Sequence, residues 1–158
     1  MKLKTFIIAG LLLAITSTIS AQSYKTGIGG RVGFFNGITV KHFLNYNNAV
    51  EGIMSFRWDG VVITGLYEWQ NPLPNAPGFD YYYGVGGHIG IFDDYKWDDD
   101  DHKGTSTVVG FDLVLGLEYT FTQAPFTLGL DYKPAFNFIG DNHVWADGFA
   151  LNLRFNIN

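Results

Sequence analysis

The stretch ADGFALNLRFNIN, residues 146–158, alternates between apolar and polar side chains along almost its whole length. Successive side chains of a β-strand point to opposite faces of a sheet. One face of this segment therefore carries Phe149, Leu151, Leu153, Phe155 and Ile157, and the other carries Ala150, Asn152, Arg154 and Asn156. The pattern predicts a strand with one fully apolar face and one polar face.

The same two-residue period recurs in seven segments upstream, each followed by a turn signal. The predicted strands are Tyr24–Asn36, Gly37–Leu44, Ala49–Trp58, Gly60–Asn71, Phe79–Phe92, Thr105–Phe121, Pro125–Phe138 and Ala146–Ile157. Asn36-Gly37 and Asp59-Gly60 are predicted to be tight hairpin turns, since both dipeptides tolerate the positive φ that a two-residue turn needs. Eight strands, an even number, predict an all-β, antiparallel up-and-down barrel.

The first 21 residues differ in character from the rest. Lys2 and Lys4 precede an apolar run, and small residues lead to Ala21. This is the pattern of a secretory signal peptide, and we expect cleavage between Ala21 and Gln22. Residues 1–21 are therefore predicted to be a cleaved signal and residues 22–158 a single barrel domain.

Composition narrows the class of protein. Without the two signal lysines, 8 basic residues face 15 acidic ones, a net charge of −7, which argues against nucleic-acid binding. The chain has no cysteine, so disulfides cannot stabilise it. Glycine is abundant (20 residues), whereas charged residues make up only 16% of the chain, few for a soluble surface. After the signal, no apolar run reaches the roughly 18 residues of a membrane-spanning helix.

The side-chain sizes on the two faces indicate which face is inside. The apolar face carries bulky residues, such as Val109 to Phe121 at every second position, which are too large for the interior of eight strands. The other face is rich in glycine. Aromatic residues gather at the strand ends, with Trp69, Tyr81, Tyr83, Tyr119, Phe126 and Phe155 towards one rim and Phe34, Phe56, Trp58, Phe136 and Phe149 towards the other. These features favour a transmembrane barrel over a soluble lipocalin-like one.

The polar face would project ten charged residues into the lumen. These are Arg31, Lys41, Arg57, Lys133 and Arg154, against Glu51, Glu68, Asp112, Glu118 and Asp131. The predicted turns place Lys41 opposite Glu51 and Asp131 opposite Arg154. They also place Glu51 opposite Glu68, and Arg154 or Lys41 is expected between these two carboxylates. Balanced charges in a narrow space favour a salt-bridged plug, and a selective pore or proton path is the alternative.

Other reactive residues give weaker signals. His88 is expected inside the barrel, where a structural role is favoured over catalysis because Ser55 and Ser106 are not grouped with it by the pattern. The acidic run Asp98, Asp99, Asp100 and Asp101 is a weak candidate for a calcium site, because it lacks the ligand spacing of an EF-hand. A solvated loop is the simpler interpretation. No motif predicts an enzyme or a cofactor.

Several segments together resemble a small outer-membrane β-barrel family of the OmpX/OmpA-like kind. They are GITVKHFL (37–44), GLYE (65–68), YGVGGH (83–88), GLEY (116–119), LDYKPAF (130–136) and LNLRF (151–155). The resemblance implies an integral barrel in the outer membrane of a Gram-negative bacterium, inserted by the barrel-assembly machinery. It also implies contact with outer-membrane lipid and lipopolysaccharide. We expect a monomer that acts as a structural or surface-interaction protein through two long outer loops, 93–104 and 139–145; a narrow porin is the alternative, and a lipid-modifying enzyme is less favoured.

Overall fold

The computed structural model describes residues 24–57, 60–94, 104–140, 144–145 and 148–157. The strands are β1 (Thr26–Gly33), β2 (Asn36–Phe43), β3 (Asn48–Arg57), β4 (Gly60–Pro72), β5 (Phe79–Asp94), β6 (Gly104–Thr120), β7 (Phe126–Tyr132), β8 (Ala135–Ile139), β9 (Val144–Trp145) and β10 (Phe149–Ile157). None of these residues belongs to a helix that could cross a membrane. The predicted signal peptide lies outside the described residues.

The strands close into a ring. Neighbours in the ring pair antiparallel from β1 to β6, and β1 also pairs with β10, so the first and last strands join. β7 and β8 pair with successive parts of β6, so together they form one interrupted strand of the barrel, which we call a stave. β10 pairs with β7, and β9 pairs with β8, so β9 and β10 together form the next strand of the barrel. The predicted all-β, eight-stranded antiparallel barrel is confirmed.

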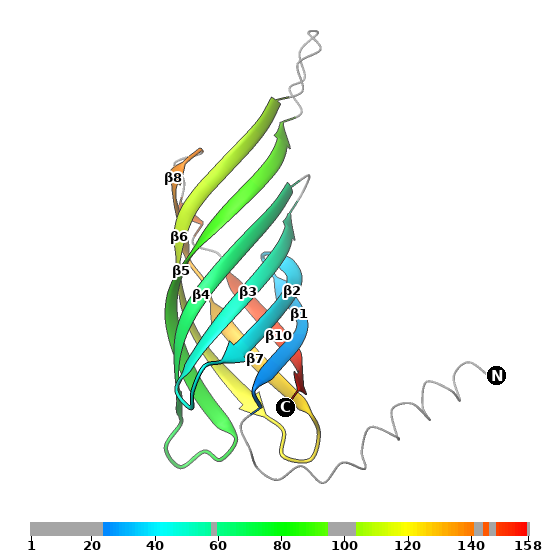
Figure 1. Cartoon of the computed structure of the whole chain (residues 1–158), viewed down its shortest axis with the longest axis vertical. Coiled ribbons are helices and arrows are strands. Elements are labelled where there is room, and N and C mark those ends of the chain that lie inside the picture. The colour runs from blue at the N-terminus through cyan, green and yellow to red at the C-terminus, as the bar shows by residue number, and fades with distance from the viewer. Residues whose placement is uncertain (1–23, 58–59, 95–103, 141–143, 146–147, 158) are drawn as a thin grey trace, which may run out of the picture.

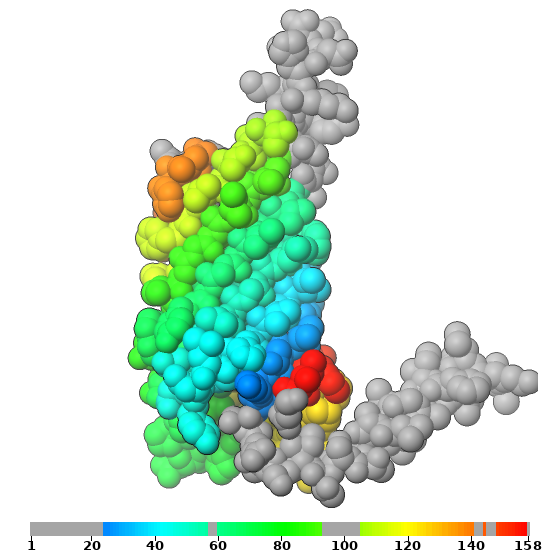
Figure 2. Space-filling view, in the orientation of Figure 1, coloured from blue at the N-terminus to red at the C-terminus, as the bar shows by residue number. Residues whose placement is uncertain are grey.

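The barrel is taller on one side than on the other. Figure 1 shows the tilted strands, with the β5–β6 hairpin rising above its neighbours, while β1 starts and β10 ends at the lower end. The staves lie against one another as slanted bands on the face drawn in Figure 2. Because each of the eight barrel strands has a hydrogen-bonded neighbour on both sides, ring closure satisfies backbone groups that would otherwise be exposed.

Burial follows the two-residue period. In β6, Phe111, Leu113, Leu115 and Leu117 are exposed on the outside, while the intervening residues from Asp112 to Glu118 are buried. β4 and β10 alternate in the same way. The interior holds two small apolar clusters, one of Ile53, Leu66, Tyr82 and Val114 and the other of Tyr24, Phe43 and Ala49.

Two predicted turns are misplaced. Asn36 and Gly37 belong to β2, where they pair with Phe56 and Ser55. The first turn lies before them, because the Asn36 side chain accepts a hydrogen bond from the Gly33 amide at 3.1 Å and closes the chain there. Arg57 pairs with Gly60, so the next hairpin also turns one residue earlier than Asp59-Gly60.

The last two staves are each interrupted. The predicted strand Pro125–Phe138 is divided at Lys133-Pro134, because Pro134 has no amide hydrogen for the ladder. The predicted strand Ala146–Ile157 begins only at Phe149, and β9 precedes it. The pairing of Phe136 with Val144 centres the turn between these staves on Gly140, which has a φ of +91°.

Gly148 is required where the interrupted staves meet. A Cβ at this position would lie 1.9 Å from the carbonyl oxygen of Lys133, whose amide donates to the Gly148 carbonyl at 3.0 Å. Gly148→Ala is therefore expected to lower the free energy of unfolding by about 1–3 kcal/mol, because the backbone must shift. Denaturant unfolding measures the loss. Gly52→Ala is the matched control, since its Cβ would meet nothing within 4 Å; equal losses in both variants would contradict the prediction.

Candidate functional site: the ion-paired interior

The charged residues predicted for the lumen are deeply buried. The exposed fraction is at most 6% for Arg31, Lys41, Glu51, Glu68, Asp112, Glu118, Asp131, Lys133 and Arg154. The side chain of the tenth, Arg57, lies outside the described residues. The nine buried side chains divide by their contacts into three groups, which we call the lower, middle and upper clusters according to their position along the strands, counted from the end where β1 starts.

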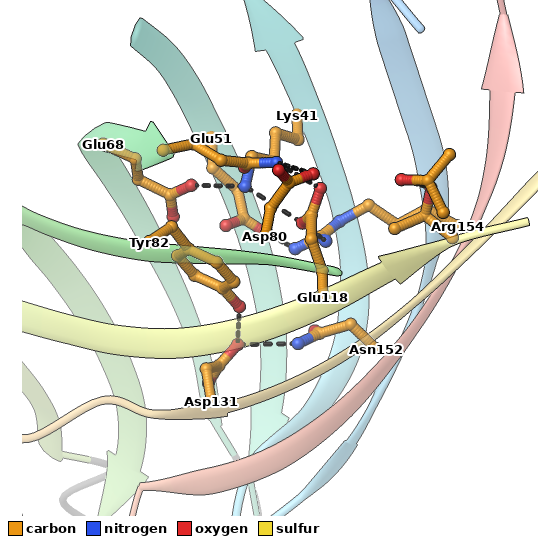
Figure 3. A network of polar contacts seen from close by, with 12 residues as sticks. Lys41, Glu51, Glu68, Asp80, Tyr82, Glu118, Asp131, Asn152 and Arg154 are labelled. Carbon is orange, nitrogen blue, oxygen red and sulfur yellow. Dashed lines mark hydrogen bonds and ion pairs between the residues drawn. The ribbon is translucent and has the colours of Figure 1, made fainter. Parts of the chain in front are cut away.

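The lower cluster consists of Lys41, Glu51, Glu68, Glu118 and Arg154, from five different strands (Figure 3). Lys41 Nζ lies 2.8 Å from Glu68 Oε2 and 3.2 Å from Glu118 Oε2. Arg154 donates to Glu51 Oε1 at 2.6 Å and to Glu118 Oε2 at 3.3 Å. Each cation therefore joins two carboxylates.

Neutral polar groups complete the hydrogen bonds of this cluster. Glu118 Oε1 accepts a hydrogen bond from the Tyr24 hydroxyl at 2.9 Å and another from Gln70 Nε2 at 2.8 Å. Glu51 accepts one from the Thr39 hydroxyl. The Lys41 ammonium also lies over the Tyr82 ring, 4.0 Å from its centroid. Such partners offset part of the cost of keeping ions out of water.

The middle cluster is built around Asp131. Arg31 binds its two carboxylate oxygens through two guanidinium nitrogens, at 2.5 and 2.7 Å. Asn152 and Tyr82 donate to Oδ2 at 2.6 and 3.0 Å, and Figure 3 shows these two side chains meeting at the carboxylate. A two-pronged arginine pair of this kind is geometrically specific and fixes the positions of both side chains.

The upper cluster contains the histidine that the sequence placed in the interior. His88 Nδ1 lies 2.7 Å from Asp112 Oδ2, and its Nε2 lies 2.9 Å from Asn137 Oδ1. Lys133 donates to the other oxygen of Asp112 at 2.5 Å. Both ring nitrogens of His88 contact side chains of the barrel wall, which is the arrangement of a histidine held within a structural network.

The observed pairs differ from those that the hairpins predicted. Lys41 does lie opposite Glu51, which confirms that register. The prediction that Asp131 faces Arg154 is wrong: Asp131 lies opposite Ala150, because the turn is centred on Gly140 rather than near residues 142–143.

The prediction that Glu51 faces Glu68 is also wrong. Glu51 lies opposite Leu66, because the β3–β4 hairpin is centred one residue earlier than expected. This changes the register by two residues, and an even shift keeps each side chain on its own face. Both carboxylates therefore remain inside, and Arg154 and Lys41 each lie beside one of them.

Several neutral members of the clusters were not identified from the sequence. Tyr82, Gln70 and Asn152 stand in the inward phase of β5, β4 and β10, so their position in the alternation could have indicated them. Tyr24 begins the predicted strand Tyr24–Asn36 in the outward phase of Ile28 and Val32, but in the structure it precedes β1 and is buried. It enters the barrel through an edge-to-face contact with Phe43, with ring centroids 5.2 Å apart.

The interior combines fixed ion pairs with neutral hydrogen-bonding groups. Among the residues that the structure describes, no group of three or more histidine or acidic side chains could hold a metal ion. The acidic run Asp98–Asp101 lies outside those residues. Within the described part of the chain, the three clusters of ion pairs keep charged side chains in fixed positions across the lumen.

The chain was compared with models of known protein families and with curated proteins. It matches no family model and no curated protein. The geometry of the barrel itself is therefore the basis for assigning a function.

Proposed function

We propose that this protein is an integral outer-membrane β-barrel of the small OmpX/OmpA-like kind with a non-conducting, ion-paired lumen. It acts as a structural or surface-interaction protein through its outer loops. The observation that carries the proposal is the inverted distribution of side chains, apolar outside and charged inside.

The inversion extends over the whole barrel. In the described part of the chain, 33 large hydrophobic side chains are exposed, whereas 16 polar or charged residues are buried. Soluble monomers expose contiguous apolar patches of only a few hundred Å². A soluble lipocalin-like barrel has the opposite distribution, with its apolar residues facing inward. Lipid is the solvent that suits this outer surface.

The apolar outer surface also has the boundaries of a membrane belt. Along β6 the outward residues from Phe111 to Leu117 are large and apolar, but Thr107 and Thr105 follow towards the upper end. Aromatic pairs lie at the lower edge, such as Trp69 stacked on Tyr83. Others lie higher, such as Phe111 on Phe136 and Tyr132 on Phe149. Two aromatic girdles around an apolar band are typical of outer-membrane barrels.

The orientation follows from the predicted signal peptide. Export through the inner membrane would leave the lower end, where β1 starts and β10 ends, facing the periplasm. The tall β5–β6 hairpin would then project from the cell surface, where its loop meets lipopolysaccharide or other partners.

A non-conducting lumen is supported by the three charged clusters. Eight strands enclose a space that side chains can fill, and here those side chains are held by ion pairs across the axis. Moving an ion along the axis would require breaking buried pairs, which is costly.

Membrane fractionation and bilayer recordings test the proposal together. We expect the full-length protein to remain in the outer-membrane fraction after extraction with urea. We also expect the purified protein, inserted into planar bilayers, to give no stable unit conductance. Recovery in the soluble periplasmic fraction would refute the membrane assignment, whereas reproducible large conductance steps would refute only the closed lumen and favour a porin.

A further inference from the structure

The lower cluster contains one more carboxylate than it has cations. Lys41 and Arg154 face Glu51, Glu68 and Glu118, and the exposed fraction of all five is at most 2%. An unbalanced charge in such a dry space is strongly unfavourable. Burial therefore favours the uptake of one positive charge by this cluster.

The unsatisfied atoms in and beside the cluster show a shortage of donors. Glu51 Oε2, both carboxylate oxygens of Glu68 and Gln70 Oε1 have no hydrogen bond within the described structure, although Lys41 Nζ makes an ion pair with Glu68 Oε2. All are acceptors, and the one unsatisfied donor of the cluster is Arg154 Nε. A further hydrogen on one of the carboxyl groups would supply the missing donor.

The two carboxyl groups with unsatisfied oxygens are neighbours. Glu51 lies opposite Leu66, and Glu68 is two residues further along β4 on the same buried face, so the two carboxyl groups are diagonal neighbours on adjacent strands. Diagonal neighbours with long side chains can reach each other, but two ionised carboxylates cannot share a hydrogen bond. Two carboxylates that share a site repel each other unless one of them is protonated. We propose that Glu51 and Glu68 form a proton-binding pair, in which Glu68 is a carboxylic acid that donates to the Glu51 carboxylate.

The partners of each residue decide which of them carries the proton. Glu51 accepts hydrogen bonds from Arg154 and from the Thr39 hydroxyl, and both favour its ionised form. Among the described side chains, Lys41 is the only cationic partner of Glu68, and Lys41 also binds Glu118. Glu68 is thus the carboxyl group with the least support for a negative charge.

In the part of the chain that the structure describes, no other strand that faces the pair supplies a compensating cation. β4 adds the neutral Gln70, β5 adds Tyr82 and the half-buried Asp80, and Tyr24 enters below β1. On β7, Asp131 is already paired with Arg31 of β1. A metal ion is a poor alternative, because no metal-binding group of acidic or histidine side chains occurs in the described residues. The inference concerns the interior alone and holds whatever surrounds the barrel.

Infrared spectroscopy of the folded protein tests the proposal. We expect a carbonyl-stretching band of a buried carboxylic acid at neutral pH in the wild-type protein and its loss in Glu68→Gln. Absence of the band from the wild-type protein would overturn the proposal. Persistence of the band in Glu68→Gln would assign the proton to another carboxyl group and would also overturn it.

A stability comparison provides a second, independent readout. Glutamine resembles a protonated glutamate, so Glu68→Gln should leave the urea midpoint of unfolding unchanged or raise it. Glu118→Gln is the matched control, because that carboxylate accepts from Lys41 and Arg154 in its ionised form, and its midpoint should fall. Equal losses in the two variants would contradict the proposal.

Discussion

Arg154→Met is expected to lower the free energy of unfolding by about 3–5 kcal/mol, the usual cost of removing one partner from a buried ion pair. Arg154 is fully buried and donates to both Glu51 and Glu118. Methionine preserves much of the side-chain volume but supplies no donor, so both carboxylates lose a charged partner in a space without bulk water. Urea unfolding in lipid vesicles measures the loss.

Two further variants separate charge from shape at this position. Arg154→Lys keeps the positive charge, so it should lower the free energy of unfolding by less than Arg154→Met does. Some loss should remain, because lysine lacks the planar guanidinium that donates to two carboxylates at once. Combining Arg154→Met with Glu51→Gln should recover part of the loss, because one unpaired charge is removed with its partner. A loss below about 1 kcal/mol for Arg154→Met would show that the cluster contributes little to stability.

Leu130→Arg is expected to destabilise the barrel in a lipid bilayer by about 2–4 kcal/mol, the cost of a lipid-facing arginine near the bilayer midplane. Leu130 is 49% exposed and lies between Leu117 and Leu151, which are the outward residues opposite it on the two neighbouring strands. If lipid covers this surface, the guanidinium must remain in hydrocarbon or distort the bilayer. Reversible unfolding from vesicles measures the effect.

Thr105→Arg is the matched control for the lipid-facing variant. Thr105 has the same outward phase as the apolar residues of β6 but lies beyond the apolar band, opposite Asp93. Its replacement should change the stability by less than about 1 kcal/mol, because the cost of a lipid-facing charge falls towards the interfaces. A neutral effect of arginine at both positions would contradict the membrane assignment, since a water-exposed surface tolerates arginine equally well at either site.

The alternation of side chains could be read directly from the chain and proved reliable. Asp112, Val114, Gly116 and Glu118 lie inside because they share one phase of β6, whatever strand lies beside them. The number of staves and their antiparallel order could also be predicted, because each hairpin joins neighbours in the sequence. Turn positions were less predictable. Asn36-Gly37 is a favourable hairpin dipeptide, yet it lies within β2, since the Asn36 side chain closes a turn before it.

The partners of the buried charges depended on contacts that local patterns do not encode. Arg31 binds Asp131, 100 residues away, because closure of the ring brings β1 close to the late strands. The last turn is centred on Gly140 and not near residues 142–143 as predicted, so Asp131 does not lie opposite Arg154. Tyr24 donates to Glu118 across 94 residues, although the alternation had placed it in the outward phase.

The alternating stretch at residues 146–158 shows both what local sequence determines and what depends on the tertiary structure. Its two-residue period alone determined that Arg154 faces one side and Leu153 the other, because the geometry of an extended backbone sets side-chain direction locally. Only the closed barrel decided that Arg154 meets Glu51 and Glu118, since register, ring closure and strand tilt together place distant strands across the lumen. Side-chain direction is a property of neighbouring residues, whereas a charge partner is a property of the whole ring.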